Sequence, residues 1–287
     1  MALRLLSLLT KFTQNRLGRV CWRGEGCGKV FVFCVFCLGV VRVRVLLAIP
    51  LSSVFPFVPF EVFVSLLKNI NFALNFFASR LNMYVEVEPK WFVGGTIAEA
   101  RNVLVAYALR EGFDYVWFND ADIAIISPDG LTKLLYHAVV KGRKIVSGVY
   151  WSRFVDERIG KPRVEVYRWV GDGFSPIATW EPDNTLLEAD AVGLGLCVIS
   201  TEIFKKLKKP WFTWYEIDLD KILAGENDVK KCIKGFGEDL NFFYRVKFEL
   251  GLNPPVLVDT SVKGKHIGFH AVIGDNRGNV KFENTPP

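Results

Sequence analysis

The sequence lacks the two common glycine-rich loops that bind phosphate groups. Neither a G-x-G-x-x-G stretch nor a G-K-[ST] stretch occurs in the 287 residues. Dehydrogenases and kinases use such loops because the backbone N–H groups of the loop surround the phosphates of the nucleotide. The absence of both loops therefore argues against these two classes.

Cysteine is scarce in most of the chain, and its distribution argues against a disulfide framework. Four of the six cysteines, Cys21, Cys27, Cys34 and Cys37, lie near the N-terminus. Cys34 and Cys37 form a single C-x-x-C pair, whereas a structural zinc site needs two well-spaced pairs. The pair lies inside an apolar run, which favours small apolar side chains over zinc ligands.

Basic residues are concentrated at the N-terminus, and the rest of the chain is nearly neutral. Residues 1–44 contain eight Lys or Arg and one acid, whereas the remainder contains 28 basic and 29 acidic residues, which together give the net charge of +6. A nucleic-acid groove needs a basic surface. The neutral body therefore argues against nucleic acid as a partner.

Residues 1–42 form a basic, cysteine-containing N-terminal extension in this interpretation. The charge-free run 30–41 is shorter than the roughly 20 residues that a membrane-spanning helix needs. Leucines recur at helical spacing among basic residues before residue 20, which is typical of a short helix at a membrane surface. The alternatives are a disordered extension and translated sequence upstream of a start near Val43. The expected localisation is cytoplasmic. If the N-terminal segment forms the membrane-surface helix, the protein would also contact the membrane surface.

Apolar patterns predict alternating strands and helices in the first half of the body. The predicted strands are 43–49, 83–87, 113–118 and 144–149, and the predicted helices between them are 56–81, 96–112 and 131–140. Thr96 and Glu99 have the spacing of a capping box at a helix start. Strands separated by helices are typical of a parallel sheet with helices on both faces. The sequence therefore predicts an α/β fold with a mostly parallel central sheet.

The second half is predicted to be more irregular. Short alternating pieces at 163–170 and 177–180 indicate a small antiparallel excursion. The sequence then predicts a strand at 191–200, a helix that begins near Thr201, a helix that opens at 235–239 and runs to about Leu250, and a strand at 255–258. We assign 43–273 to one domain and 274–287 to a polar, frayed C-terminal tail.

Two acids follow the buried strand 113–118. In extended backbone, residues i and i+2 point to the same face, so Asp120 and Asp122 are expected to converge. Two such carboxylates repel each other unless a cation lies between them. The pair therefore predicts a site for a divalent metal that prefers oxygen ligands.

Five features in order resemble the metal-dependent glycosyltransferases of the GT-A fold. They are Asp120-Ala121-Asp122, then 146–150, then 191–195, then Gly237-Glu238-Asp239, and then His266. The resemblance covers about residues 43–270 and implies a single GT-A (Rossmann-like) domain. It also implies transfer of a sugar from a nucleotide-diphosphate sugar to a hydroxyl of a glycan, lipid or protein acceptor, assisted by Mn²⁺ or Mg²⁺.

The resemblance assigns roles to particular residues. The metal ligands would be Asp120, Asp122 and His266, with His270 as an alternative to His266. Asp239 would be the catalytic base of an inverting reaction, with Glu238 as the alternative base. A helix N-terminus is expected to keep the pKa of Asp239 low. The donor-binding residues would be Pro50, Glu86 (or Glu88), Arg101, Asn102, Asp120, Gly193 and Gly195.

Two other functions remain open. A sugar-phosphate nucleotidyltransferase has a related fold, but its usual glycine-rich loop after the first strand is replaced by Ile49-Pro50-Leu51-Ser52-Ser53. The other alternative is a non-catalytic carbohydrate-binding protein of the same fold. Trp151, Trp211 and Trp214 would stack on sugar rings in any of these functions, or belong to the core. The sequence gives neither the sugar nor the oligomeric state.

Overall fold

The structure is a computed structural model that describes residues 40–51, 57–93, 95–156, 160–180, 184–226, 233–268, 270–277 and 279–284. These residues belong to one compact unit that begins at Val41, apart from Val40. Most of the predicted N-terminal extension, including its four cysteines, lies outside the described residues.

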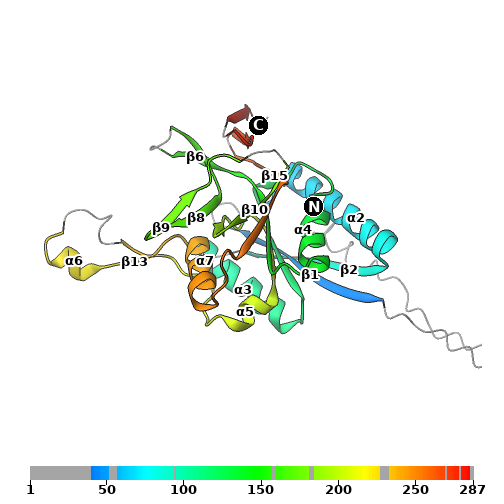
Figure 1. The fold of residues 1–287 in the computed structure, drawn as a ribbon, viewed down its shortest axis with the longest axis horizontal. Coiled ribbons are helices and arrows are strands. Elements are labelled where there is room, and N and C mark those ends of the chain that lie inside the picture. The colour runs from blue at the N-terminus through cyan, green and yellow to red at the C-terminus, as the bar shows by residue number, and fades with distance from the viewer. Residues whose placement is uncertain are drawn as a thin grey trace, which may run out of the picture. The chain divides into compact units, whose positions relative to one another are not determined.

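A mixed sheet forms the centre of the fold (Figure 1). Its six central strands are β2 (Met83–Val93), β1 (Val41–Leu51), β3 (Tyr115–Asn119), β12 (Leu196–Ser200), β5 (Ile145–Val149) and β15 (Val256–His266), in that spatial order. β12 runs antiparallel to β3 and β5, and the other neighbouring pairs are parallel. The predicted α/β class with a mostly parallel central sheet is confirmed.

Shorter strands extend this sheet or form small sheets beside it. β4 (Ile123–Ile125), β10 (Leu186–Ala189), β16 (His270–Gly274) and β17 (Val280–Asn284) belong to the large sheet. β8 (Val166–Val170), β9 (Gly173–Pro176) and β11 (Ala191–Val192) form an antiparallel sheet, and β6 (Trp151–Asp156) pairs with β7 (Lys161–Val164). The two small sheets, β11-β8-β9 and β6-β7, form the predicted antiparallel excursion.

Helices cover both faces of the sheet (Figure 1). On one side are α2 (Phe60–Leu81) and α4 (Gly130–Leu135), which continues as the π-helical turn η1 (Tyr136–Val140). On the other side are α3 (Ile97–Arg110), α5 (Thr201–Lys206) and α7 (Glu238–Glu249). Alternate residues of β1 supply the two cores: Val45 and Leu47 pack toward α2, and Leu46 packs toward α3. Each such buried side chain contributes about 1.5–3 kcal/mol of burial free energy.

Two more short strands and one short helix complete the described fold. β13 (Glu216–Ile217) pairs with β14 (Ile233–Lys234), and α6 (Leu219–Leu223) lies between them in the chain. No residue of α6 is buried.

The predicted capping box at the start of α3 is confirmed. The Glu99 N–H donates to Thr96 Oγ1 at 3.2 Å, and the Thr96 N–H donates to Glu99 Oε2 at 2.8 Å. These reciprocal bonds satisfy two backbone donors that a helix start otherwise leaves unpaired. They fix where α3 begins, and thereby the position of Arg101 one turn later.

Several predicted boundaries were wrong. β2 continues to Val93 instead of ending at Val87, because it lies at the sheet edge, where Pro89 is tolerated. The predicted strand 191–200 is interrupted by a turn at Leu194 and Gly195. Residues 177–180 form no strand. The tail that was expected to be frayed contains β17, which pairs antiparallel with β16 along its whole length.

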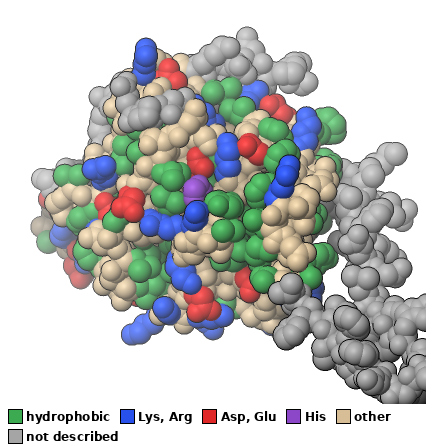
Figure 2. Space-filling view, turned by 45° about the vertical axis from the view of Figure 1, so that its right-hand side comes forward, with side chains coloured by type: hydrophobic (Ala, Val, Ile, Leu, Met, Phe, Trp, Pro, Cys, Tyr) green, Lys and Arg blue, Asp and Glu red, His purple; other side chains and the backbone are tan. Residues whose placement is uncertain are grey.

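Charged side chains of both signs are interspersed on the molecular face that Figure 2 shows. Lysine and arginine side chains on that face are separated by acidic and apolar side chains. This distribution agrees with the nearly neutral charge of the body.

Candidate functional site

The two acids after β3 lie in a turn rather than in extended backbone. β3 ends at Asn119, whose amide donates to the carbonyls of Asp120 and Ile123, both at 2.9 Å. The Ile123 N–H also donates to the Asp120 carbonyl at 3.1 Å. The expectation of extended backbone at Asp120 and Asp122 was therefore wrong, because β3 ends before them, although the two carboxylates still lie near enough to act on each other electrostatically.

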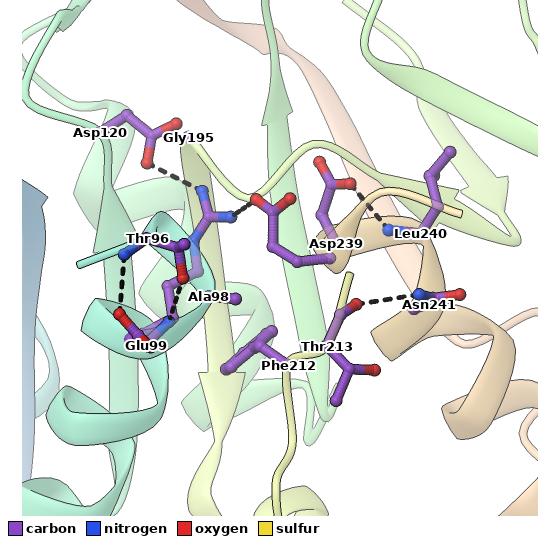
Figure 3. Close-up of polar contacts among 12 residues, drawn as sticks. Thr96, Ala98, Glu99, Asp120, Gly195, Phe212, Thr213, Asp239, Leu240 and Asn241 are labelled. Carbon is purple, nitrogen blue, oxygen red and sulfur yellow. Dashed lines mark hydrogen bonds and ion pairs between the residues drawn. The ribbon is translucent and has the colours of Figure 1, made fainter. Parts of the chain in front are cut away.

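Asp120 pairs with a buried arginine. Arg101 Nη2 lies 3.0 Å from Asp120 Oδ1, and Arg101 Nη1 forms an ion pair with Glu238 (Figure 3). Arg101 is only 2% exposed, so a side chain of α3 connects the end of β3 with the start of α7 inside the protein. Burial raises the pKa of Asp120, as does the nearby Asp122, although Arg101 opposes this shift.

Asp122 pairs with His266 on the opposite side of the turn. The end of β15 pairs antiparallel with β4, which places His266 opposite Ile123 and lets the Ile267 N–H donate to the Asp122 carbonyl at 2.7 Å. His266 Nε2 lies 3.3 Å from Asp122 Oδ2, and His266 Nδ1 lies 2.9 Å from the Trp151 carbonyl. A carbonyl accepts only, so Nδ1 carries the proton and Nε2 faces the carboxylate.

The electrostatics of this pair favour charge on both partners. Burial acts to raise the pKa of Asp122, but the hydrogen bond to His266 and the charge of Arg153 outweigh burial and lower it. Burial acts to lower the pKa of His266, yet the Asp122 carboxylate raises it.

Two of the three predicted metal ligands are together and the third is not. Asp122 Oδ2 and His266 Nε2 lie 3.3 Å apart, and the Trp151 carbonyl orients the imidazole as a hydrogen-bond partner does in many metal sites. Asp120 points toward Arg101 instead. Within the described residues, no three His, Cys, Asp or Glu side chains are grouped as a metal site. The pair fits Mn²⁺ or Mg²⁺ if phosphate and water supply the other ligands.

Asp239 is a buried carboxyl group with a raised pKa. It lies in the first turn of α7, as predicted, and its Oδ1 accepts from the Leu240 N–H at 2.8 Å (Figure 3). Burial, reinforced by Glu238, raises its pKa to about 7 despite the charge of Arg101. The expectation of a low pKa was wrong, because burial and neighbouring carboxylates outweigh the helix N-terminus.

Glu238 is held differently from its neighbour. Its side chain is 10% exposed and forms the ion pair with Arg101. This contact engages the Glu238 carboxylate, whereas the Asp239 carboxylate accepts a hydrogen bond from the backbone N–H of Leu240.

Three side chains near the site had no role in the sequence analysis. Tyr150, Glu165 and Tyr167 follow β5 or lie in the antiparallel excursion, and the Tyr167 hydroxyl lies 2.5 Å from Glu165 Oε2. Burial raises the pKa of Glu165, and burial together with Asp120 raises that of Tyr150 well above its ordinary value. Of the three, only Tyr150 had a signal in the sequence, which is its position directly after a buried strand.

The two glycines of 193–195 make room for Tyr150. A Cβ on Gly193 would lie 2.1 Å from Tyr150 Oη, and a Cβ on Gly195 would lie 2.9 Å from Tyr150 and 3.0 Å from Asp120 Oδ2. The Gly195 N–H also donates to Tyr150 Oη at 3.0 Å. In the structure, Tyr150 fills the space that the sequence analysis assigned to a ligand.

Gly193→Ala is therefore expected to destabilise the protein by about 1–3 kcal/mol, because the new methyl group would displace the buried Tyr150. Urea denaturation measures this change. Gly173→Ala is the matched control, since no described atom lies within 4 Å of its added Cβ, and its effect should stay within about 0.5 kcal/mol. Equal effects of the two substitutions would contradict this packing.

The other predicted donor-binding residues lie elsewhere or serve the fold. Glu86 pairs with Arg42 and Arg44 near the start of β2, far along the strand from its carboxyl end at Val93. The expected position of Glu86 at the end of the second strand was wrong, because β2 is longer than expected. Pro50 lies inside β1, level with Phe92 of β2, rather than directly after the strand.

Asn102 anchors an aromatic loop. Its amide donates to the carbonyls of Ala98 and Phe212, and its oxygen accepts from the N–H groups of Trp211 and Phe212. The side chain positions this loop and has no amide hydrogen left for a ligand.

The three tryptophans differ in exposure. Trp151 and Trp211 are 1% and 3% exposed and belong to the core. Trp214 is 44% exposed, and its ring approaches the position of a Cβ on Gly237 at 4.0 Å. Trp214 is thus the one of the three that is exposed, and it lies next to Gly237 at the start of α7.

No protein-family model matches the chain, and no curated protein matches it. Solved structures show weak likeness. The protein A197 from STIV is 18% identical with a TM-score of 0.46, over 85% of this chain and 95% of that one.

Two further solved structures show weaker likeness. The catalytic domain of Drosophila β1,4-galactosyltransferase 7, in complex with xylobiose, is 17% identical with a TM-score of 0.35, over 78% of this chain and 68% of that one. A putative glucose-1-phosphate thymidylyltransferase from Bacillus anthracis, in complex with a sucrose, is 10% identical with a TM-score of 0.35, over 79% of this chain and 89% of that one. We draw no functional conclusion from likeness at this level.

Proposed function

We propose that this protein is a glycosyltransferase that moves a sugar from a nucleotide-diphosphate sugar to an acceptor hydroxyl with the help of a divalent metal. One observation carries the proposal. The Arg101 ion pairs with Asp120 and Glu238 bring Asp122, with its partner His266, and Asp239 of α7 to the end of β3. Ligands of open α/β sheets bind at the carboxyl ends of the strands, and Asp120 and Asp122 follow such an end.

Asp239 is the base in this proposal. Its carboxylate accepts the proton of the acceptor hydroxyl while the hydroxyl oxygen bonds to the anomeric carbon and the bond to the diphosphate breaks. Attack from the face opposite the leaving group inverts the anomeric configuration. A pKa near 7 suits this role, because a base is most effective when its pKa lies near the working pH.

Arg101 positions the reacting groups. It is too deeply buried to contact a sugar directly, but it fixes Asp120 and Glu238, and hence the start of α7. Asp120 Oδ2, which is not used by Arg101, lies 3.0 Å from the position of a Cβ on Gly195.

Asp122 and His266 would hold Mn²⁺ or Mg²⁺ in this proposal. A divalent ion bound there supplies charge neutralisation for the departing diphosphate. The chain's own contribution is the orientation of both ligands, through the Trp151 carbonyl and the β4–β15 pairing.

The metal role predicts metal-dependent donor binding. In a panel of nucleotide sugars, at least one is expected to raise the melting temperature by about 5 °C or more with Mn²⁺, at a hundredfold excess over its Kd, and much less without the metal. Asp122→Ala should remove the metal dependence and change the unliganded melting temperature little. Asp172→Ala, in the 171–172 turn, is the control and should behave as wild type. A panel with no response, or an Asp122→Ala variant that responds like wild type, would refute the assignment.

A further inference from the structure

The guanidinium of Arg153 lies where a cation held by Asp122 and His266 would be. Arg153 Nη1 is 2.8 Å from Asp122 Oδ2, and the same oxygen is 3.3 Å from His266 Nε2. One carboxylate oxygen thus contacts both side chains. A divalent ion on that oxygen would be placed against the guanidinium charge, and like charges at such a separation repel.

The backbone around Arg153 is irregular, and its side chain is not locked in the core. The β6–β7 register shifts between Trp151 and Val155, so Arg153 lies in a distorted part of the strand. Its side chain is 42% exposed and packs over the ring of Phe154, which is itself 70% exposed. The guanidinium can therefore leave Asp122 without disturbing buried packing.

We propose that Arg153 is a diphosphate-binding residue that pairs with Asp122 until a divalent cation binds, and then transfers to the donor diphosphate. This inference rests on the proposed function. A released guanidinium beside the metal faces the place where the diphosphate must lie, and its planar fork matches two phosphate oxygens. The same side chain opposes metal binding and favours nucleotide binding.

The exchange couples the two ligands. Metal binding breaks the Arg153–Asp122 ion pair and loses its interaction free energy. A bound diphosphate restores a comparable interaction, because its oxygens accept hydrogen bonds from the released guanidinium. The diphosphate should therefore raise the affinity for the metal, and by thermodynamic reciprocity the metal should raise the affinity for the diphosphate by the same factor. Couplings of this kind range from about fivefold to 150-fold.

Titration of the full chain with Mn²⁺, followed by the electron paramagnetic resonance signal of free Mn²⁺, tests this exchange. Each variant is titrated alone and with uridine or guanosine diphosphate, with protein-free titrations to correct for metal bound by the nucleotide. Arg153→Gln should bind Mn²⁺ alone about tenfold more tightly than wild type and bind the nucleotide in the presence of Mn²⁺ about tenfold more weakly. Arg153→Lys keeps the charge but not the fork, so only its nucleotide affinity should fall.

Arg143→Gln is the matched control, because Arg143 is comparably exposed and pairs with Glu188 at 3.1 Å. It should match wild type in both titrations. If wild type binds Mn²⁺ and nucleotide and Arg153→Gln has the same two affinities, the inference is overturned while the proposed function stands. If no variant binds Mn²⁺ with either nucleotide, both are overturned.

Discussion

Asp239→Asn is expected to slow sugar transfer by a factor of about 10²–10⁴ and to leave donor binding unchanged. The amide has nearly the shape of the carboxylate but cannot accept the proton of the acceptor hydroxyl. The Asp239 side chain would contact the acceptor rather than the diphosphate, so the Kd of the donor should stay within about twofold. Steady-state kinetics and calorimetric titration of the donor measure the two quantities.

The pH dependence separates a base from a merely structural residue. Because the pKa of Asp239 is raised to about 7, kcat/KM should rise about tenfold per pH unit below pH 7 and level off above it. The variant should lose this rise. Glu249→Gln, at the far end of the same helix, is the control and should keep the wild-type profile. Normal turnover by Asp239→Asn would remove Asp239 as the base.

Thermal stability should change in the opposite sense to activity. A carboxyl whose pKa is higher in the folded state than its unfolded value of about 4 costs stability once it ionises. This cost is absent below about pH 4, grows as the pH rises, and is complete above about pH 7. Asp239→Asn should therefore raise the melting temperature by a few degrees at pH 8 and hardly at all at pH 4.

Arg101→Met is expected to destabilise the fold by about 3–5 kcal/mol. The substitution removes the buried guanidinium and leaves Glu238 and Asp120 without their cation, and an uncompensated buried charge is among the costliest single changes. Urea denaturation at pH 8 measures the loss. Arg110→Met, on the same helix, is the control, because Arg110 is exposed and its loss should cost less than about 0.5 kcal/mol.

A second variant separates the loss of charge pairing from the loss of packing. The double variant Arg101→Met, Glu238→Leu removes both members of the buried pair and should recover part of the loss, because an apolar replacement of a buried ion pair is often tolerated. An Arg101→Met variant as stable as the Arg110→Met control would contradict the role of Arg101 as the link between β3 and α7.

The order of elements could be predicted from local patterns. Apolar runs identified most of the central strands, and the Thr96–Glu99 spacing located the start of α3. Where a predicted element boundary was wrong, the cause was the position of that element in the tertiary structure. Pro89 was expected to lie beyond the second strand, yet it lies within β2, because that strand has a free edge in the described sheet.

Several residues of the candidate site could be predicted from the sequence, but the contacts between their side chains could not. The spacing of acids and histidine pointed to Asp122, His266 and Asp239, yet whether two of them meet depends on β4 pairing with the end of β15. The turn at Asp120 had a local signal, since asparagine and aspartate both favour turns. The contact of Arg153 had none, because an ion pair between positions 31 residues apart has no pattern in the sequence.

Incubation of the purified protein with a panel of nucleotide sugars and Mn²⁺, quenched with a chelator and resolved by ion-exchange chromatography, tests the central claim most directly. We predict release of nucleoside diphosphate from at least one donor by wild type, and none above background by Asp122→Ala. Added pyrophosphate should yield no nucleoside triphosphate. Formation of nucleoside triphosphate and sugar phosphate would instead show a nucleotidyltransferase, and no turnover of any donor would contradict the glycosyltransferase assignment.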